Sequence, residues 1–238
     1  MLEQTVPSLA KAAVLERAGA LLPKFREAIA DIPPEAGFGG IWESELLLFY
    51  AAVQPFAPQQ ILESGRARGK STLVLARCFP EARIVSVELD SASLNAAAAE
   101  AKLRPYHNVE LVYGDSRQIL PQRLQHGDAV LIDGPKDFRA LELALDLLGT
   151  GRPCLIFVHD FPPRTPWRRF VERHWRGAFF GDDPMFEPFW TLDDERDPRR
   201  DQRRRAYGVF VCLPPELPAP YWRLRLSLLL TRALRRVV

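Results

Sequence analysis

The sequence lacks the features that would mark a secreted or membrane-spanning protein. Its three cysteines in 238 residues, Cys78, Cys154 and Cys212, are far apart and form no zinc-binding or disulfide pattern. We expect buried thiols in a reducing compartment, which predicts a cytoplasmic protein. No uncharged apolar run reaches about 18 residues, so no membrane span is expected. The first residues carry two acids and no continuous apolar core, unlike a signal peptide.

A large excess of one charge is also absent, because the formal net charge is only +2. Residues 164–238 nevertheless hold 16 arginines and 10 acidic residues, a net charge of +6. A solvated basic surface is the commoner interpretation of such a segment, and an anionic partner is the alternative. The arginines between Arg196 and Arg205 have no aromatic residue among them, so no stacking platform for nucleic acid is indicated.

What the sequence does have is a regular alternation of apolar strand patterns with helical patterns. Near-continuous apolar strands separated by helices are typical of a parallel sheet with both faces covered. We therefore predict an α/β fold, a doubly wound, mostly parallel, seven-stranded sheet of the Rossmann-like type. The predicted strands are 59–65, 83–90, 108–115, 128–134, 153–160, 176–182 and 206–213, and residues 183–205 are expected to form a long loop.

Three regions follow from this pattern. Residues 1–54 are predicted to be an N-terminal helical cap, in which Pro23 divides the helical segment 8–31 into two short helices. Residues 55–213 form the α/β domain. Residues 214–238 form a basic amphipathic tail, and its segment 219–238 would place Trp222 and several leucines on one helical face, although the same residues also alternate like a strand.

Ligands of such sheets bind beyond the carboxyl ends of the strands. The loop after the first predicted strand holds Gly65 and Gly69, with Ala67 where a nucleotide fingerprint often has a glycine. Glu88 ends the next strand, 23 residues after Gly65, where a carboxylate accepts hydrogen bonds from ribose hydroxyls. The alternative interpretation of the glycine loop is a tight turn between the strand and the next helix, without a ligand. Asp115 is expected either near the adenine of the same ligand or as a helix cap.

Residues 69–72 have the sequence Gly-Lys-Ser-Thr, like the end of a phosphate-binding P-loop. That motif requires a glycine five positions before Gly69, and Ser64 stands there instead. A nucleotide triphosphatase is therefore the weakest of the alternatives.

Taken together, ILESGRARGKST, SVELD, YGDS, LIDGPK and FVHDF resemble the class I S-adenosylmethionine-dependent methyltransferases, over about residues 40–213. The chain is most similar to an uncharacterised bacterial group of methyltransferase-like proteins. The resemblance implies S-adenosylmethionine as cofactor, with Glu88 at the ribose hydroxyls and Asp115 near adenine. It places the other cofactor-site residues at the ends of the first, third and fourth strands: Glu63, Ser64, Gly65, Gly69, Ser116 and Asp133.

Asp133-Gly134-Pro135-Lys136 is also distantly similar to the Asp-x-x-Lys of catechol-type O-methyltransferases. That similarity implies Asp133 and Asp160 as ligands of Mg²⁺ or Mn²⁺ and Lys136 as the base that takes a hydroxyl proton. His159-Asp160-Phe161 replaces the usual Asp-Asn pair, so His159 is expected to orient rather than to ligate. The alternatives are a cofactor-site Asp133 without metal and a solvated Lys136.

We therefore predict an S-adenosylmethionine-dependent methyltransferase that O-methylates a small hydroxylated molecule, with or without a divalent metal. A non-catalytic cofactor-fold scaffold, tethered by its basic tail, is the alternative. Residues 219–238 are expected to contact a membrane surface, the domain itself or a second copy in a homodimer. The aromatic residues that precede and begin the predicted 183–205 loop are expected to be either a wall of the substrate site or a small core: Phe179, Phe180, Phe186, Phe189 and Trp190.

Overall fold

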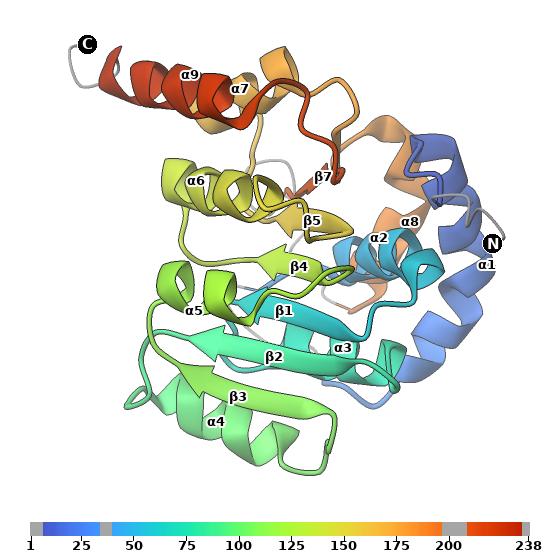
Figure 1. Cartoon of the computed structure of the whole chain (residues 1–238). Helices are drawn as coiled ribbons and strands as arrows, with labels where there is room; N and C mark the ends of the chain where they lie inside the picture. Colours follow the sequence, from blue (N-terminus) through green and yellow to red (C-terminus); the bar gives the residue numbers. More distant parts are fainter. Residues whose placement is uncertain (1–6, 34–39, 197–208, 235–238) are drawn as a thin grey trace, which may run out of the picture.

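The computed structural model describes residues 7–33, 40–196 and 209–234. One seven-stranded sheet runs through it in the order β3-β2-β1-β4-β5-β7-β6, with helices on both faces (Figure 1). Neighbouring strands from β3 to β5 pair in parallel, whereas β7 pairs antiparallel with both β5 and β6. The predicted fold, a mostly parallel seven-stranded sheet, is confirmed.

The strands are short and almost wholly buried in the centre of the sheet. Their bounds are β1 Gln60–Ser64, β2 Arg83–Glu88, β3 Val109–Tyr113, β4 Ala129–Ile132, β5 Leu155–Val158, β6 Phe179–Phe180 and β7 Val211–Leu213. The helices are α1 Lys11–Ile29, α2 Glu43–Val53, α3 Lys70–Cys78, α4 Leu94–Leu103, α5 Ser116–Arg123, α6 Asp137–Leu148, α7 Pro166–His174, α8 Glu187–Arg196 and α9 Tyr221–Leu234.

Alternate residues of each strand feed two separate hydrophobic clusters, one on each side of the sheet. The first contains Ile61 of β1 and joins α1, α2 and α3 to the sheet. The second contains Leu62 and joins α5, α6, α7 and α9. This period-2 division is why the strands read as continuous apolar runs, since both of their faces are covered.

Several local predictions need correction. Helix α1 is continuous through Pro23, because Pro23 and Gly19 are exposed and water can bond the Gly19 carbonyl that loses its amide partner. Helix α4 is capped by Ser93, which accepts a hydrogen bond from the amide of Ala96. The expected loop 183–205 begins with a 3-10 turn and helix α8; the rest of it lies outside the described residues.

The N-terminal helices are not set apart from the α/β domain. Every residue of α2 is buried, and its apolar side chains belong to the same cluster as β1 and α3. Helices α1 and α2 therefore contribute to the core of the domain on one face of the sheet.

The tail forms helix α9, not a strand, and packs beside α6 and α7 (Figure 1). Among the described helices, none combines the length and apolarity that a membrane crossing would need.

Candidate functional site

The carboxyl ends of β1 and β4 lie side by side at the point where the strand order reverses, which is where sheets of this kind bind ligands. Gly65 has a φ of +82°, and a Cβ there would lie 2.7 Å from the carbonyl carbon of Asp133. The loop after β1 therefore approaches the loop after β4 so closely that only glycine fits. Gly69 also has a positive φ, +77°, at the start of α3.

Glu88 reaches this loop from the end of β2. One of its carboxylate oxygens accepts a hydrogen bond from the amide of Ala67 at 2.8 Å, and the other accepts one from the amide of Leu89. The acid is only partly buried, so its carboxylate remains open to a ligand at the rim of the loop. The structure thus brings together the glycine loop and the acid that sequence spacing predicted.

Arg66 lies inside the same loop, and its side chain was not anticipated. It is 2 % exposed; its Nη1 donates to the carbonyl of Ser86 at 2.5 Å, and its guanidinium carbon lies 4.8 Å from the centroid of the Tyr113 ring. Its Nε and Nη2 have no hydrogen-bond partner among the described residues. A buried guanidinium with two unused donors is costly, so acceptors from a ligand or water are expected there.

The Glu63 carboxylate points into the core and not toward the loop rim. It accepts hydrogen bonds from the hydroxyls of Ser71, Thr72 and Ser86 at 2.5–2.6 Å and is fully buried. Burial raises the pKa of Glu63, and the three hydroxyls oppose that rise. The Glu63 carboxylate thus joins β1 to α3 and β2, and the predicted contact of this residue with the cofactor stays a prediction.

The hydroxyls of Ser64 and Ser116 both donate to the carbonyl of Gly134, which fastens the loops after β1, β3 and β4 together. Asp115 caps α5 through the amide of Arg117 and forms an ion pair with the guanidinium of the same residue. These bonds lower the pKa of Asp115. The capping alternative is thus observed, while contact with adenine stays a prediction.

The P-loop alternative is wrong. Lys70 is buried and forms an ion pair of 2.7 Å with Glu43 of α2. Ser71 and Thr72 are engaged by Glu63, as described above. None of the three side chains that a P-loop would turn toward phosphates and Mg²⁺ is available to a nucleotide.

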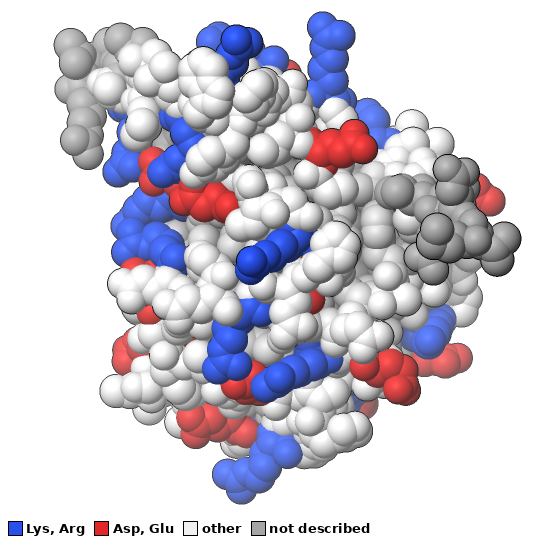
Figure 2. Space-filling model, viewed as in Figure 1, with Lys and Arg blue, Asp and Glu red and all other residues white. Residues whose placement is uncertain are grey.

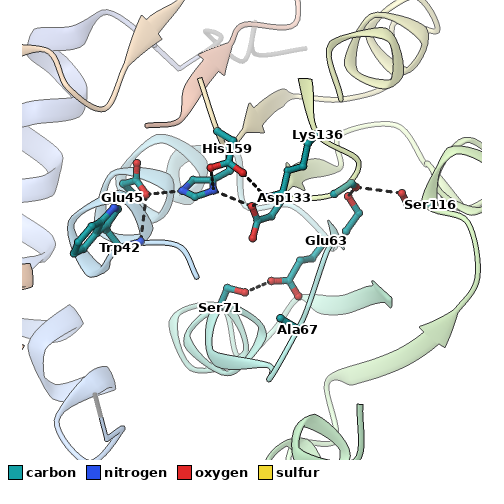
Figure 3. A network of polar contacts seen from close by, with 12 residues as sticks. Trp42, Glu45, Glu63, Ala67, Ser71, Ser116, Asp133, Lys136 and His159 are labelled. Atoms are coloured by element: carbon teal, nitrogen blue, oxygen red, sulfur yellow. Dashed lines mark hydrogen bonds and ion pairs between the residues drawn. The ribbon is translucent and has the colours of Figure 1, made fainter. Parts of the chain in front are cut away.

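A buried histidine after β5, His159, links the carboxylate after β4 to a carboxylate of α2 (Figure 3). His159 is 5 % exposed; its Nδ1 lies 2.8 Å from Asp133 and its Nε2 lies 3.1 Å from Glu45 of α2. Burial alone would lower the pKa of His159, but the two carboxylates raise it well above its usual value. With a carboxylate at each ring nitrogen, His159 is an imidazolium that donates to both acids; its predicted orienting role stays a prediction.

Lys136 completes this cluster from the loop after β4. Its Nζ lies 2.6 Å from Asp133 and 2.5 Å from Asp160, so its ammonium bridges the two acids predicted to hold a metal. Burial would lower the pKa of Lys136, and the two carboxylates outweigh it and raise the pKa. Asp133 responds in the opposite sense, because burial would raise its pKa while His159 and Lys136 lower it.

Donor atoms of Asp133, His159 and Asp160 lie within 4.8 Å of one another, which would suit a cation. Both nitrogens of His159 are engaged by carboxylates, however, and the Lys136 ammonium already lies between the two aspartates. The donor set therefore does not fit a resident divalent metal while Lys136 holds this position.

Three of the five aromatic residues expected at a substrate wall or a small core are core residues, while Phe180 and Trp190 are partly buried. Phe179, Phe186 and Phe189 are buried in the cluster that contains α2, and the Phe180 ring is covered by the guanidinium of Arg168 at 4.1 Å. The arginine run that ends at Arg205 lies outside the described side chains.

Two residues of this site were missed at the level of sequence. Glu45 is one of two acids in an otherwise apolar helix, and its burial there already called for a cationic partner. Arg66 lies between Gly65 and Gly69 in a loop that is expected to contact a ligand through its backbone. An acid within an apolar helix is the signal that would have singled out Glu45. Nothing in the local sequence distinguishes Arg66.

Residues 62–161 match the model of a family described as a methyltransferase domain. No curated protein is significantly similar to the sequence. Among solved structures, the O-methyltransferase TomG of Streptomyces achromogenes in complex with SAM is 21% identical, with 81% of this chain and 88% of that chain covered and a TM-score of 0.47. An O-methyltransferase of Bacillus cereus in complex with SAH is 19% identical, with 89% and 93% covered and a TM-score of 0.47.

The matched segment begins in β1 and ends just after β5, so it contains the glycine loop, Glu88, Asp115 and the cluster at Asp133. The family that this segment matches is the one that its sequence motifs resemble.

Proposed function

We propose that this protein is an S-adenosylmethionine-dependent methyltransferase that transfers a methyl group to the hydroxyl oxygen of a small molecule. The observation that carries the proposal is the glycine loop at the strand-order reversal, with the Glu88 carboxylate hydrogen-bonded across its rim. In this proposal the ribose hydroxyls of the cofactor donate to Glu88, and the unused donors of Arg66 meet acceptors of the nucleoside.

The acceptor oxygen is proposed to approach Lys136 and Asp160, the most exposed members of the charged cluster, with side chains 45% and 35% exposed. A lysine with a raised pKa is protonated at neutral pH, so it cannot serve as the base. It can donate a hydrogen bond to the acceptor oxygen, while the Asp160 carboxylate beside it takes the hydroxyl proton as the oxygen–methyl bond forms and the sulfur–methyl bond of the cofactor breaks. Transfer then depends mainly on how the acceptor is positioned in line with the methyl group.

The Lys136 ammonium is thus the cation beside Asp133 and Asp160, in the place where the sequence resemblance implied a metal. If a divalent ion were bound, Asp133 and Asp160 would hold it, and it would supply the same positive charge to the acceptor oxygen. No step requires it, because the two positive charges of Lys136 and His159 balance two of the three negative charges of Asp133, Asp160 and Glu45.

The three cysteines are free and buried, which supports the proposal that the enzyme works in a reducing compartment such as the cytoplasm.

Calorimetry with S-adenosylmethionine tests the proposed function. Glu88→Ala should weaken binding about 10- to 150-fold, since hydrogen bonds to a charged group contribute roughly 1.5–3 kcal/mol. Glu110→Ala is the matched control, because Glu110 lies on β3 and pairs only with the surface residues Arg83 and Arg123; its affinity should equal that of the unaltered protein. Equal affinity in both variants, or binding of ATP in preference to S-adenosylmethionine, would overturn the proposal.

If the protein binds S-adenosylmethionine with the expected Glu88 dependence but methylates no hydroxylated acceptor, it is the non-catalytic scaffold.

A further inference from the structure

Helix α9 is attached to the domain by one side only. Leu224 and Leu228 are buried against α6 and α7, the Tyr221 hydroxyl donates to Asp146 at 2.6 Å, and Arg232 forms an ion pair with Glu142 at 2.7 Å. These contacts hold the helix firmly in place, and they leave its opposite side uncovered by any described residue.

That uncovered side is apolar. Trp222 is 61% exposed, and Leu226, Leu229 and Leu230 are 50–55% exposed. Their spacing of four, seven and eight residues from Trp222 puts all four on one face of the helix, opposite to Leu224 and Leu228. A contiguous exposed apolar stripe, unlike scattered single residues, marks an interaction surface.

Arginines border the stripe on both sides. Arg223 lies beside Trp222, with its guanidinium carbon 5.1 Å from the indole, and Arg225 and Arg232 lie on the other side, facing α6. On α7, Arg169 and Arg173 make no ion pair with any described residue, and they line a hollow of about 200 Å³ with Thr231 of α9. The surface over α9 in Figure 2 is largely white, with basic and some acidic side chains beside it.

We propose that the exposed stripe of α9, together with Arg169 and Arg173 of α7, docks this protein on an anionic lipid bilayer. Leucines and a tryptophan on a helix face bordered by arginines suit the boundary between acyl chains and headgroups. Arg169 and Arg173, which have no carboxylate partner among the described residues, would attract headgroup phosphates beside α9. A second copy of this chain fits less well, because a twofold contact between two such faces would oppose arginine to arginine.

Co-sedimentation with vesicles tests this. The full chain should bind vesicles of phosphatidylcholine mixed with phosphatidylglycerol, and bind weakly to phosphatidylcholine alone. Binding should fall as salt screens the arginines. The fluorescence of Trp222 should shift to shorter wavelength on binding, a change that Trp222→Phe removes.

Point variants on the exposed side separate docking from folding. Arg169→Gln with Arg173→Gln should weaken binding to the anionic vesicles ~25-fold, about fivefold for each arginine lost. Leu226→Ser with Leu230→Ser should weaken it about 10- to 30-fold, because half-exposed leucines then bury no apolar area in the bilayer. Leu94→Ser is the matched control; Leu94 is 91% exposed on α4, and this change should leave binding unaltered.

Three results would overturn the proposal: no binding to anionic vesicles, equal binding to neutral and anionic vesicles, or equal loss in the Leu94→Ser control. Concentration-dependent dimerisation that the two serine changes abolish, without vesicle binding, would assign the stripe to a second copy instead.

Discussion

Replacing His159 with glutamine should expose how strongly the fold depends on one buried charge. Glutamine retains hydrogen-bonding groups but carries no charge, so Glu45 and Asp133 would lose their shared cation, and their side chains are only 6% and 14% exposed. Removing one partner of a buried ion pair costs roughly 3–5 kcal/mol. The variant should therefore lose about 3–5 kcal/mol of unfolding free energy.

Denaturant unfolding followed by circular dichroism measures this loss, and the melting temperature should fall by about 2–4 °C for each kcal/mol. The pKa of His159 is raised in the folded state, so its contribution is fully present below the pKa of about 6.5 in the unfolded chain and is lost as pH rises through the folded value. The replacement should therefore cost more at pH 6 than at pH 8, because above about pH 6.5 folding of the unaltered protein must take up a proton on His159.

His174→Gln is the matched control. His174 is half-buried, bonds only Ser227, and has its pKa lowered by burial and by Arg173, so it is neutral at pH 7. Its replacement should cost about 1 kcal/mol or less. An equal cost for the two variants, or a His159→Gln cost that does not change with pH, would refute the imidazolium assignment.

Two further predictions concern the loops at the strand ends. Lys136→Met should reduce turnover by ~10²–10⁴-fold with little change in S-adenosylmethionine affinity. A chelator should leave the unaltered enzyme active. Mn²⁺ titration followed by electron spin resonance should show tighter Mn²⁺ binding in the variant, because Asp133 and Asp160 then lack the Lys136 ammonium. Inactivation of the unaltered enzyme by chelator would contradict this prediction and support a metal-assisted reaction. Gly65→Ala should abolish measurable S-adenosylmethionine binding in calorimetry, since its Cβ would lie 2.7 Å from backbone atoms of the β4 loop, whereas Gly127→Ala, where a Cβ meets nothing within 4 Å, should cost stability through its positive φ but preserve binding. Equal binding by both glycine variants would contradict the close approach of the two loops.

The layout of the sheet could be predicted because it depends on local pattern. Each strand is a short apolar run, each helix follows it with helical spacing, and the glycines and acids stand at the strand ends, where a parallel sheet collects its ligand-binding residues. This arrangement alone puts the loop of Gly65 beside Glu88, because β1 and β2 are neighbours both in the sheet and in the sequence.

The identity of each charged partner was decided only by tertiary structure. Glu45 and His159 are 114 positions apart and meet because α2 packs against the sheet beside the end of β5. Lys70 looks like a phosphate-binding lysine in sequence and is an ion-pair partner of Glu43 in the fold. The face of α9 that carries Trp222 reads as a typical buried stripe, yet Leu224 and Leu228 make the contact with α6 and α7. Sequence spacing determines which residues share a face, but the neighbour that covers a face, and the counter-charge that a buried group finds, depend on elements distant in the chain.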